Sequence, residues 1–296
     1  MASLYTHQDS NIRKTWLLMG IFFLFIIGIG WAFSTAYNAP EVLYIAIIIS
    51  LFMNVGSYWY SDKLVIAMTK AKPVTNESHP DFYNIVENLS ITAGLPMPKV
   101  YVVEDSAPNA FATGRDKDHA AIAATTGLLS ILDKTELEGV IAHELSHIGN
   151  RDILISTIAV VLAGFIAILS DMFLRMARFG GGRNNREGGR AQAIAMIIGL
   201  VFAILAPIAA TMIRLALSRK REFLADASGA LLTRYPEGLA RALEKIGNYA
   251  TPMKSASDAT AHLFISNPFG PMSKGLHALF LTHPPMAERI KALREN

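Results

Sequence analysis

Apolar residues are gathered into four long runs, separated by segments of mixed polarity. The runs cover residues 15–37, 41–60, 153–170 and 191–213. The first lacks Asp, Glu, Lys and Arg and, like the second, is long enough to cross a bilayer. The pattern predicts about four transmembrane helices: an N-terminal hairpin in residues 1–72, and a second transmembrane or re-entrant hairpin in residues 153–213.

The first run has a competing interpretation, because Ser34-Thr35-Ala36 loosely resembles the cleavage site of a signal peptide. Its apolar stretch is longer than a usual signal core, and a second run follows directly after Asn38-Ala39-Pro40. We therefore favour an uncleaved hairpin. The length and low charge of the third and fourth runs favour spans over buried core helices.

Basic residues indicate an orientation for the first hairpin. The loop between its two runs has no Lys or Arg, whereas basic residues flank the other ends: Arg13, Lys14, Lys63, Lys70 and Lys72. By the positive-inside rule, the N-terminus and the segment after Tyr60 face the cytoplasm. The second hairpin conflicts with this rule, because its glycine-rich loop, residues 175–190, contains five arginines. Two full spans and a re-entrant hairpin both remain open for residues 153–213.

Composition agrees with a membrane protein, since 52% of residues are hydrophobic and 17% are charged. The net charge of +3 is too small and scattered to indicate nucleic-acid binding. The chain has no cysteine, which excludes disulfides and thiolate ligands. Histidines and carboxylates are left to bind any metal.

The polar segments, residues 73–152 and 214–296, predict an α+β, mainly helical fold with a small sheet. Residues 80–93 have a helical pattern that Gly94-Leu95-Pro96 ends. Residues 99–104, 109–113 and 120–125 are expected to be strands. Thr135 and Glu138 have the spacing of a capping box for the next helix.

That next helix carries the most specific motif of the chain, His143-Glu144-Leu145-Ser146-His147. Histidines four residues apart project from one face of a helix and can share a metal ion. The carboxylate of Glu144 is then placed to reach a water molecule at that metal. A chance match to this motif is uncommon, and the helical context makes coincidence a still poorer explanation. The motif predicts a zinc site with its general base.

A hydrolytic zinc usually has three protein ligands. Glu222 and Asp226, after the fourth apolar run, are four residues apart and would share one helix face. Glu222 could bind the metal while Asp226 accepts a hydrogen bond from a ligating imidazole. Alternatively, Glu222 pairs with Arg219 or Lys220 on a solvated surface. The spacing alone does not separate these two interpretations.

Over almost its whole length, including the order of apolar runs, the sequence resembles the HtpX branch of the integral-membrane M48 zinc metalloproteases. The histidine motif followed by Asn150-Arg151-Asp152 is similar to the active-site helix of that family, and residues 218–226 to its third-ligand helix. Two further motifs are Asn109-Ala110-Phe111-Ala112-Thr113-Gly114 and Thr282-His283-Pro284-Pro285. Phe223 stands where the family usually has Tyr.

The resemblance implies a zincin-like protease domain in two parts, residues 73–152 and 214–296. It implies one Zn²⁺ per chain, held by His143, His147 and Glu222, with Asp226 behind the ligands and Glu144 as catalytic base. It also assigns substrate binding to Asn109, Ala110, Phe111 and Ala112, a segment that by itself is an ordinary strand. His283 is a second catalytic candidate, either for the oxyanion or for the fourth zinc position at rest. It could equally be a turn residue before a helix at residues 286–293.

The expected protein is a multi-pass, zinc-dependent endopeptidase of the cell membrane, with its site facing the cytoplasm. The resemblance implies polypeptide substrates, mainly misfolded or damaged membrane proteins, and a role in stress response and quality control. A prenyl-protein-type processing peptidase is the alternative within the superfamily, disfavoured because four spans are few to enclose a lipid chamber. A non-catalytic zinc-binding scaffold or transporter is disfavoured by the intact Glu144.

Overall fold

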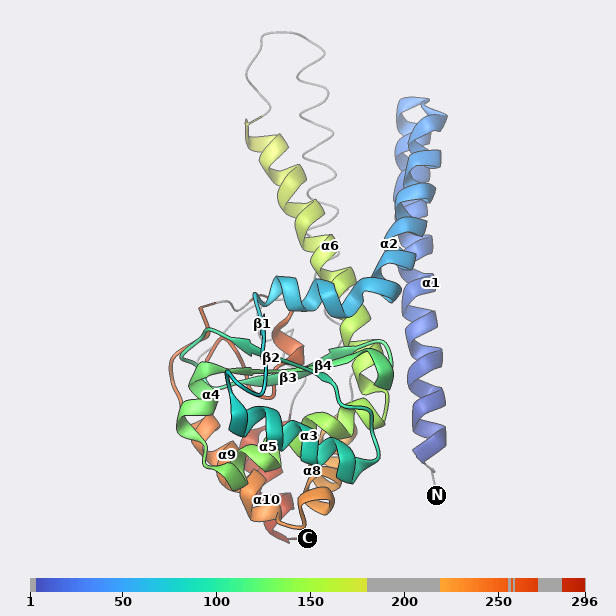
Figure 1. Ribbon diagram of the computed structural model, residues 1–296. Helices are drawn as coiled ribbons and strands as arrows, with labels where there is room; N and C mark the ends of the chain where they lie inside the picture. The colour runs from blue at the N-terminus through green and yellow to red at the C-terminus, as the bar shows by residue number, and fades with distance from the viewer. Residues whose placement is uncertain (1–3, 180–218, 255–256, 258, 271–283, 296) are drawn as a thin grey trace.

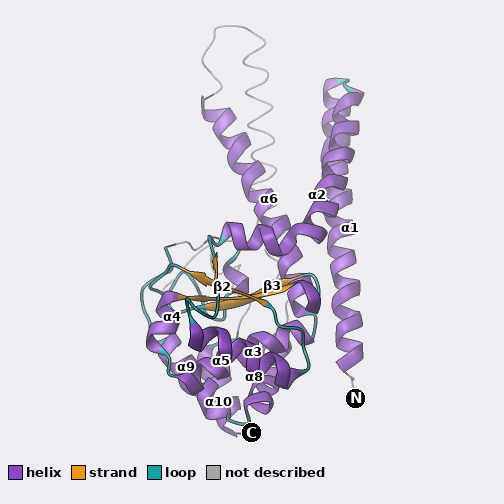
Figure 2. Cartoon of the chain, in the orientation of Figure 1, coloured by secondary structure: helices purple, strands orange, loops and turns teal. Residues whose placement is uncertain are grey.

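The structure is a computed structural model that describes residues 4–179, 219–254, 257, 259–270 and 284–295. Two helices at the N-terminus, α1 (Leu4–Tyr37) and α2 (Pro40–Met68), form a long antiparallel hairpin above a domain of helices and a small sheet (Figures 1 and 2). The fourth apolar run and His283 lie outside the described residues.

Both hairpin helices are long and apolar enough to cross a membrane, over Gln8–Thr35 and Pro40–Met68. Each extends beyond the apolar run that predicted it. The N-terminal turns of α1 pass beside the domain, and the C-terminal part of α2 turns away from α1 to lie across the sheet (Figure 1). Val65, at this end of α2, is fully buried against the sheet and α6. The hairpin is therefore packed onto the domain and not merely tethered to it.

The sheet has four strands in the order β1-β2-β4-β3. Strand β2 (Lys99–Val103) is parallel to β4 (Ala120–Thr125), while β1 (Lys72–Pro73) and β3 (Ala110–Gly114) pair antiparallel at the two edges. The three longer strands match the sequence prediction to within one residue, and β1 was not predicted. A two-residue edge strand has too few residues to show a period of two.

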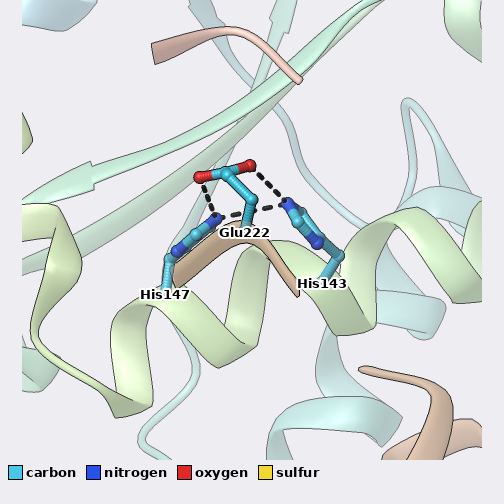
Figure 3. A group of neighbouring side chains, drawn as sticks. All are labelled: His143, His147 and Glu222. Carbon is cyan, nitrogen blue, oxygen red and sulfur yellow. Dashed lines mark hydrogen bonds and ion pairs between the residues drawn. The ribbon is translucent and has the colours of Figure 1, made fainter. Parts of the chain in front are cut away.

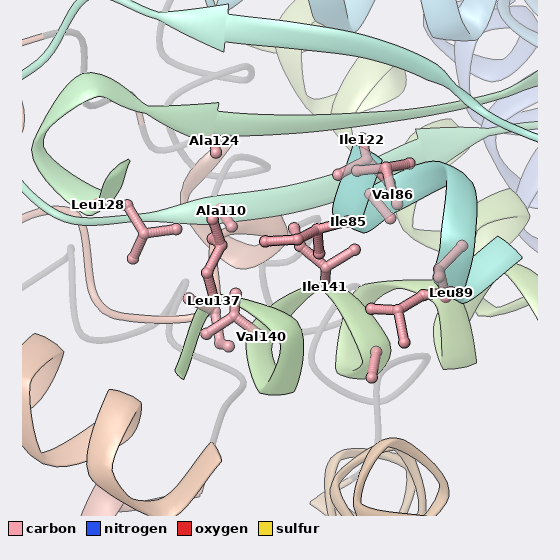
Figure 4. Packing of buried hydrophobic residues seen from close by; sticks show 14 of the residues in the cluster. Ile85, Val86, Leu89, Ala110, Ile122, Ala124, Leu128, Leu137, Val140 and Ile141 are labelled. Carbon is pink, nitrogen blue, oxygen red and sulfur yellow. The ribbon is translucent and has the colours of Figure 1, made fainter. Parts of the chain in front are cut away.

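Alternate residues of the sheet face two different hydrophobic clusters. Ala110, Ile122 and Ala124 pack toward α3 (Pro80–Ala93) and α5 (Lys134–Gly149), as Figure 4 shows. Phe111 and Ala123 face α2 and α6 (Asp152–Phe179) on the other side. Because both faces are covered, every residue of β3 and β4 is buried.

Helix α5 begins with a capping box, but not the predicted one. Asp133 is the N-cap and accepts from the backbone of Glu136, whose side chain accepts from the backbone of Asp133. The predicted start at Thr135 and Glu138 was wrong by two residues. The Thr135 hydroxyl instead donates to Asp133. Asp satisfies the same backbone donors as Thr, and the pattern of apolar residues is compatible with either start.

At its other end α5 turns sharply into α6, and the two helices make an angle of 86°. Asn150 is the C-cap, and Arg151 adopts a left-handed conformation with φ of 56°. This corner places Asp152 in the first turn of α6, facing back toward α5. Helices α5 and α6 are long and apolar enough to be a membrane span only when the two are taken together. Since α5 is buried in the domain core, it does not serve as half of a span.

Two later helices close the domain around α5. Gly229 of α8 (Arg219–Thr233) lies so close that a Cβ there would be 2.9 Å from the backbone nitrogen of His143. Gly139 allows a similar approach of α9 (Pro236–Gly247). The C-terminal helix α10 (Met286–Glu295) packs on α8 and α9. The remaining short helices are α4 (Thr126–Ile131), η1 (Lys117–His119) and η2 (Ala261–Leu263).

The prediction of a mainly helical protein with a small sheet is confirmed, and the structure shows that the sheet is mixed. Of the about four spans predicted, two are found within the described residues, and the number four stays a prediction. The fold also joins the two polar segments, residues 73–152 and 214–296, because α5 from the first packs on α8 and α9 from the second.

Candidate metal centre

Three side chains from two helices converge between α5 and α8. His143 and His147 project from one face of α5, and the carboxylate of Glu222 lies over them from α8 (Figure 3). The two Nε2 atoms are 3.2 Å apart. The Glu222 oxygens lie 3.8 Å from Nε2 of His143 and 3.7 Å from Nε2 of His147. The Glu222 side chain is 12% exposed, so it is not a solvated surface partner of Arg219 or Lys220.

His143 is held from behind by a carboxylate and a buried arginine. Its Nδ1 lies 2.9 Å from Oδ1 of Asp226, four residues after Glu222 on α8. Both oxygens of Asp226 accept from Arg289 of α10, at 2.7 and 2.8 Å. The Arg289 side chain is fully buried and also donates to the backbone oxygen of Ile265. We call His143, Asp226 and Arg289 the inner arm of the site.

His147 is held in the same way by a different set of residues. Its Nδ1 lies 3.1 Å from Oδ2 of Asp152, at the start of α6. The other oxygen of Asp152 accepts from Nη1 of Arg221 at 3.1 Å and from Nδ2 of Asn11 at 2.7 Å. Asn11 belongs to α1, the first helix of the hairpin. We call His147, Asp152, Arg221 and Asn11 the outer arm.

The charges of the site shift two pKa values. Burial raises the pKa of Asp226, but the charge and hydrogen bonds of Arg289 outweigh it and hold that pKa well below 3.8. Burial lowers the pKa of His147, whereas the Asp152 hydrogen bond and the charges of Glu222, Asp152 and Glu144 raise it to about 9. The site therefore keeps Asp226 ionised and favours a positive charge at His147.

The arrangement fits a zinc ion. Tetrahedral zinc with bonds of about 2.0–2.2 Å to N and O places its ligand atoms about 3.3–3.6 Å apart, close to the separations observed here. Each Nδ1 is directed at a carboxylate, so the Nε2 lone pairs of both rings and the Glu222 carboxylate converge on one point. Three electron-rich groups at such distances repel one another unless a cation lies between them. In metal-free protein, a proton on His147 meets this need.

Glu144 follows His143 on α5, is buried, and exerts its charge on His147. It is thus close to the metal centre without being one of the three convergent groups. This is the placement expected of a base that acts beside the metal.

Strand β3 runs along α5 at the edge of the sheet, and other segments bond to part of that edge. Ile265 donates to the backbone oxygen of Ala110, and the Asn109 side chain makes paired hydrogen bonds with the backbone of Ser266. At the other end, Gly114 donates to the hydroxyl of Thr157. By the alternation of an antiparallel strand, the N–H and C=O of Ala112 point outward between these two contacts.

The four predicted substrate residues therefore differ in which of their groups remain available to bind a substrate. The side chain of Asn109 is engaged by Ser266, and that of Phe111 is buried edge-to-face on Phe264. The outward backbone of Ala110 accepts from Ile265. Within the described part of the chain, Ala112 alone of the four has outward backbone groups with no partner drawn from another segment.

Sequence reasoning found the three convergent residues and Asp226 but assigned no role to Asp152, Arg221, Arg289 or Asn11. Asp152 belongs to the Asn150-Arg151-Asp152 motif that follows His147, so its closeness to the motif could have indicated a role at the metal centre. Arg289 and Asn11 lie on the last and first helices, far from the motif in sequence. A buried arginine in an otherwise polar helix, or an asparagine near the start of an apolar one, has no distinctive local pattern.

Comparison with known proteins agrees with this geometry. Residues 76–296 match the peptidase family M48. The chain belongs to that family. It is 49% identical to "Protease HtpX homolog" of Thermoanaerobacter pseudethanolicus, covering 99% of this chain and 97% of that protein. The same name is given to a protein of Syntrophobacter fumaroxidans that is 49% identical, with 97% and 99% covered.

A solved structure, S. mikatae Ste24p, resembles this M48 peptidase in fold, with a TM-score of 0.50. The alignment covers 95% of this chain and 66% of Ste24p, so the M48 chain spans less than two thirds of that protein. Sequence identity is 19%, and the likeness is therefore one of fold alone. Together with two helices able to cross a membrane, these findings make the chain a membrane-bound peptidase of the HtpX type.

Proposed function

We propose that this M48 peptidase is a zinc-dependent endopeptidase that cleaves unfolded polypeptides, chiefly misfolded or damaged membrane proteins. One observation carries the proposal: His143, His147 and Glu222 converge with both imidazoles oriented by carboxylates. Such carboxylate-histidine pairs are the usual support of catalytic zinc ligands. A zinc ion bound there would supply Lewis-acid activation of water and of the scissile carbonyl.

The protein's own residues perform the proton transfers. Glu144 takes a proton from the attacking water and passes it to the leaving amine. Asp226 and Asp152 keep Nδ1 of each histidine protonated, so that both Nε2 atoms remain available as ligands. Arg289 keeps Asp226 ionised and oriented, and Arg221 orients Asp152 through a hydrogen bond. His283 is proposed to assist at the oxyanion. If His283→Ala has wild-type kinetics, its alternative role as a turn residue before α10 is favoured.

The substrate backbone is proposed to pair with β3 at Ala112. Main-chain pairing of an extended peptide to a sheet edge reads sequence weakly, which suits unfolded substrates. The hydrogen bond from Ile265 to Ala110 limits the length of β3 that a substrate can pair with at one end, and the bond from Gly114 to Thr157 limits it at the other. The substrate strand is thus expected to be short unless the Ile265 contact opens.

The decisive experiment compares wild-type protein with Glu144→Gln, both purified in detergent under chelator and then given zinc. About one zinc per chain in both proteins, with casein cleavage in the wild type alone, is the expected result. Cleavage by Glu144→Gln would remove the proposed base. Zinc in both without cleavage in either would favour the scaffold alternative. A panel of an unfolded membrane protein and a lipidated peptide separates quality control from prenyl-type processing.

The domain is proposed to lie on the cytoplasmic side, with α6 and the run at residues 191–213 as further spans. Exposed Trp16 of α1 and Trp59 of α2 lie at one level of the hairpin, because Trp16 is stacked on Tyr58, next to Trp59, and Arg115 lies over the Trp59 ring. Aromatic and basic residues at one level are typical of a membrane interface.

The chain has no cysteine, so single cysteines introduced at Asn38 and Glu104 can be labelled without background. Labelling of both from the same side of sealed vesicles would contradict the topology.

A further inference from the structure

Helix α1 presents three polar side chains to the corner between α5 and α6. Gln8, Asn11 and Thr15 are spaced by three and four residues, so they share one helix face. Asn11 is 3% exposed and Thr15 is 1% exposed. Gln8 donates to the backbone oxygen of Gly149 at 2.8 Å. Among the described residues, the Thr15 hydroxyl bonds only within its own helix, to the backbone oxygen of Asn11.

Of these three residues, Asn11 reaches the outer arm. Its Nδ2 donates to Oδ1 of Asp152 at 2.7 Å and to the backbone oxygen of Asn150 at 3.3 Å. Its Oδ1 accepts from Nη1 of Arg221 at 3.4 Å. The side-chain amide of Asn11 therefore donates to a residue of α6 and accepts from a residue of α8, two elements that support the metal centre.

Both of these partners stand directly behind a proposed zinc ligand. Asp152 accepts from His147 through its other oxygen, so any rotation of that carboxylate moves the histidine. Arg221 precedes Glu222 on α8, so its side chain fixes the start of the helix that carries the third ligand. Outer partners of this kind set ligand orientation, and their loss typically weakens metal binding about 10–100-fold.

We propose that Asn11 is a positioning residue of the metal centre, by which the membrane hairpin sets the orientation of His147 and Glu222 through Asp152 and Arg221. The inference rests on the proposed zinc site. It makes the first membrane helix a working part of the peptidase and not only its anchor. Zinc affinity should accordingly depend on how α1 sits against the domain.

The test compares Asn11→Leu with two controls on the same face of α1. Leu keeps the size and helical propensity of the side chain but removes both hydrogen bonds. Thr15→Val changes an equally buried residue without touching Asp152, and Gln8→Leu removes a contact to Gly149 alone. Asn11→Gln keeps the amide and serves as the conservative variant.

Zinc affinity of the full-length protein in detergent is measured by competition with a chelator. We expect about tenfold weaker binding in Asn11→Leu, partial recovery in Asn11→Gln and wild-type affinity in Thr15→Val and Gln8→Leu. The absorption bands of Co²⁺ in the zinc site should shift in Asn11→Leu. With zinc saturating, kcat should fall while KM for an unfolded chain is unchanged, because Asn11 is not part of the β3 edge.

A double-mutant cycle shows whether Asn11 acts through Asp152. If it does, adding Asn11→Leu to Asp152→Asn should weaken zinc binding little further, because coupled residues are not additive. If the double variant instead weakens zinc binding by the product of the two single effects, Asn11 does not act through Asp152 and the proposal is overturned. A lower melting temperature of metal-free Asn11→Leu with zinc affinity and the Co²⁺ spectrum unchanged would also overturn it, since that pattern indicates packing alone.

The wild type is measured first, and this separates two kinds of failure. Wild-type protein that binds no zinc refutes the proposed function. Wild-type protein that binds zinc, beside Asn11→Leu of equal affinity, spectrum and kcat, refutes the positioning role and leaves the proposed function intact.

Discussion

The inner and outer arms have the same chemical plan but different origins. In each, a histidine contacts a carboxylate that is held by an arginine. The inner arm lies wholly among helices of the domain, with Arg289 fully buried and both Asp226 oxygens paired. The outer arm is built from the start of α6, the start of α8 and a residue of the membrane hairpin.

This difference shows how two ligands on one helix can respond to different parts of the protein. The inner arm is locked by packing and by a bidentate ion pair, so its geometry is set when the domain folds. The outer arm includes Asn11, so its geometry also depends on where α1 lies. His147 is the more exposed ligand, at 14% against 1% for His143. Four substitutions, with their controls, test this comparison in decreasing order of expected effect.

The largest effect should come from breaking the inner arm. Arg289→Met leaves Asp226 buried without its cation, and removing one partner of a buried pair costs about 3–5 kcal/mol. We expect much lower thermal stability and loss of zinc. Unfolding followed by fluorescence, with zinc content measured in the same samples, tests this. Wild-type stability in Arg289→Met would show that the inner arm is not set by the ion pair.

A second substitution should disturb both arms at once, because α8 carries Asp226 and Arg221. The Cβ of Gly229→Ala would lie 2.9 Å from the nitrogen of His143, so the helices must separate. Such overpacking costs about 1–3 kcal/mol and moves Glu222 away from the histidines. Gly149→Ala is the control, since its Cβ meets only Leu95 Cδ1 at 3.8 Å. Equal zinc affinities of the two variants would contradict the close approach.

Breaking the outer arm alone should weaken the metal site more than the fold. Asp152→Asn keeps the shape of the side chain but loses the charge that orients His147 and Arg221. We expect zinc binding about 10–100-fold weaker with a small change in melting temperature. Asp226→Asn is the matched variant of the inner arm, and it should destabilise the fold more because Arg289 is the more deeply buried cation. The reverse order of the two melting temperatures would refute the comparison.

The smallest effect is expected at the surface of the same C-terminal helix. Arg294 bonds to Glu237 and Glu244 of α9, and its hydrogen bond holds the pKa of Glu237 below its usual 4.5. A lowered folded pKa stabilises the protein above about 4.5, and the stabilisation is lost as pH falls through the folded value. Arg294→Gln should therefore be slightly less stable than wild type at pH 7, and the difference should shrink as the pH is lowered below 4.5. A large difference at pH 7, in high salt, would contradict an exposed, screened contact.

Local patterns were sufficient for much of the fold. Helix α3 was predicted over residues 80–93 because a proline opens it and Gly94 follows it, and Gly94 has the left-handed conformation expected there. Strands β2, β3 and β4 followed from short runs of apolar residues. The start of α5 was misplaced because two overlapping box motifs compete, and side-chain geometry chooses Asp133. Strand β1 was missed because its two residues form a strand only by pairing with β2.

The sequence by itself determined the chemistry: two histidines at helical spacing, an adjacent glutamate, no cysteine and apolar runs long enough for a membrane. These properties follow from residue identity and short-range periodicity, which any sequence displays directly. Only the tertiary structure decided that Glu222 faces the histidines, that Asn109 is engaged by Ser266, and that Asn11 and Arg289 complete the two arms. Those contacts join residues up to 210 positions apart, as Asn11 and Arg221 are. Their existence depends on the packing of whole helices, and no local pattern encodes that packing.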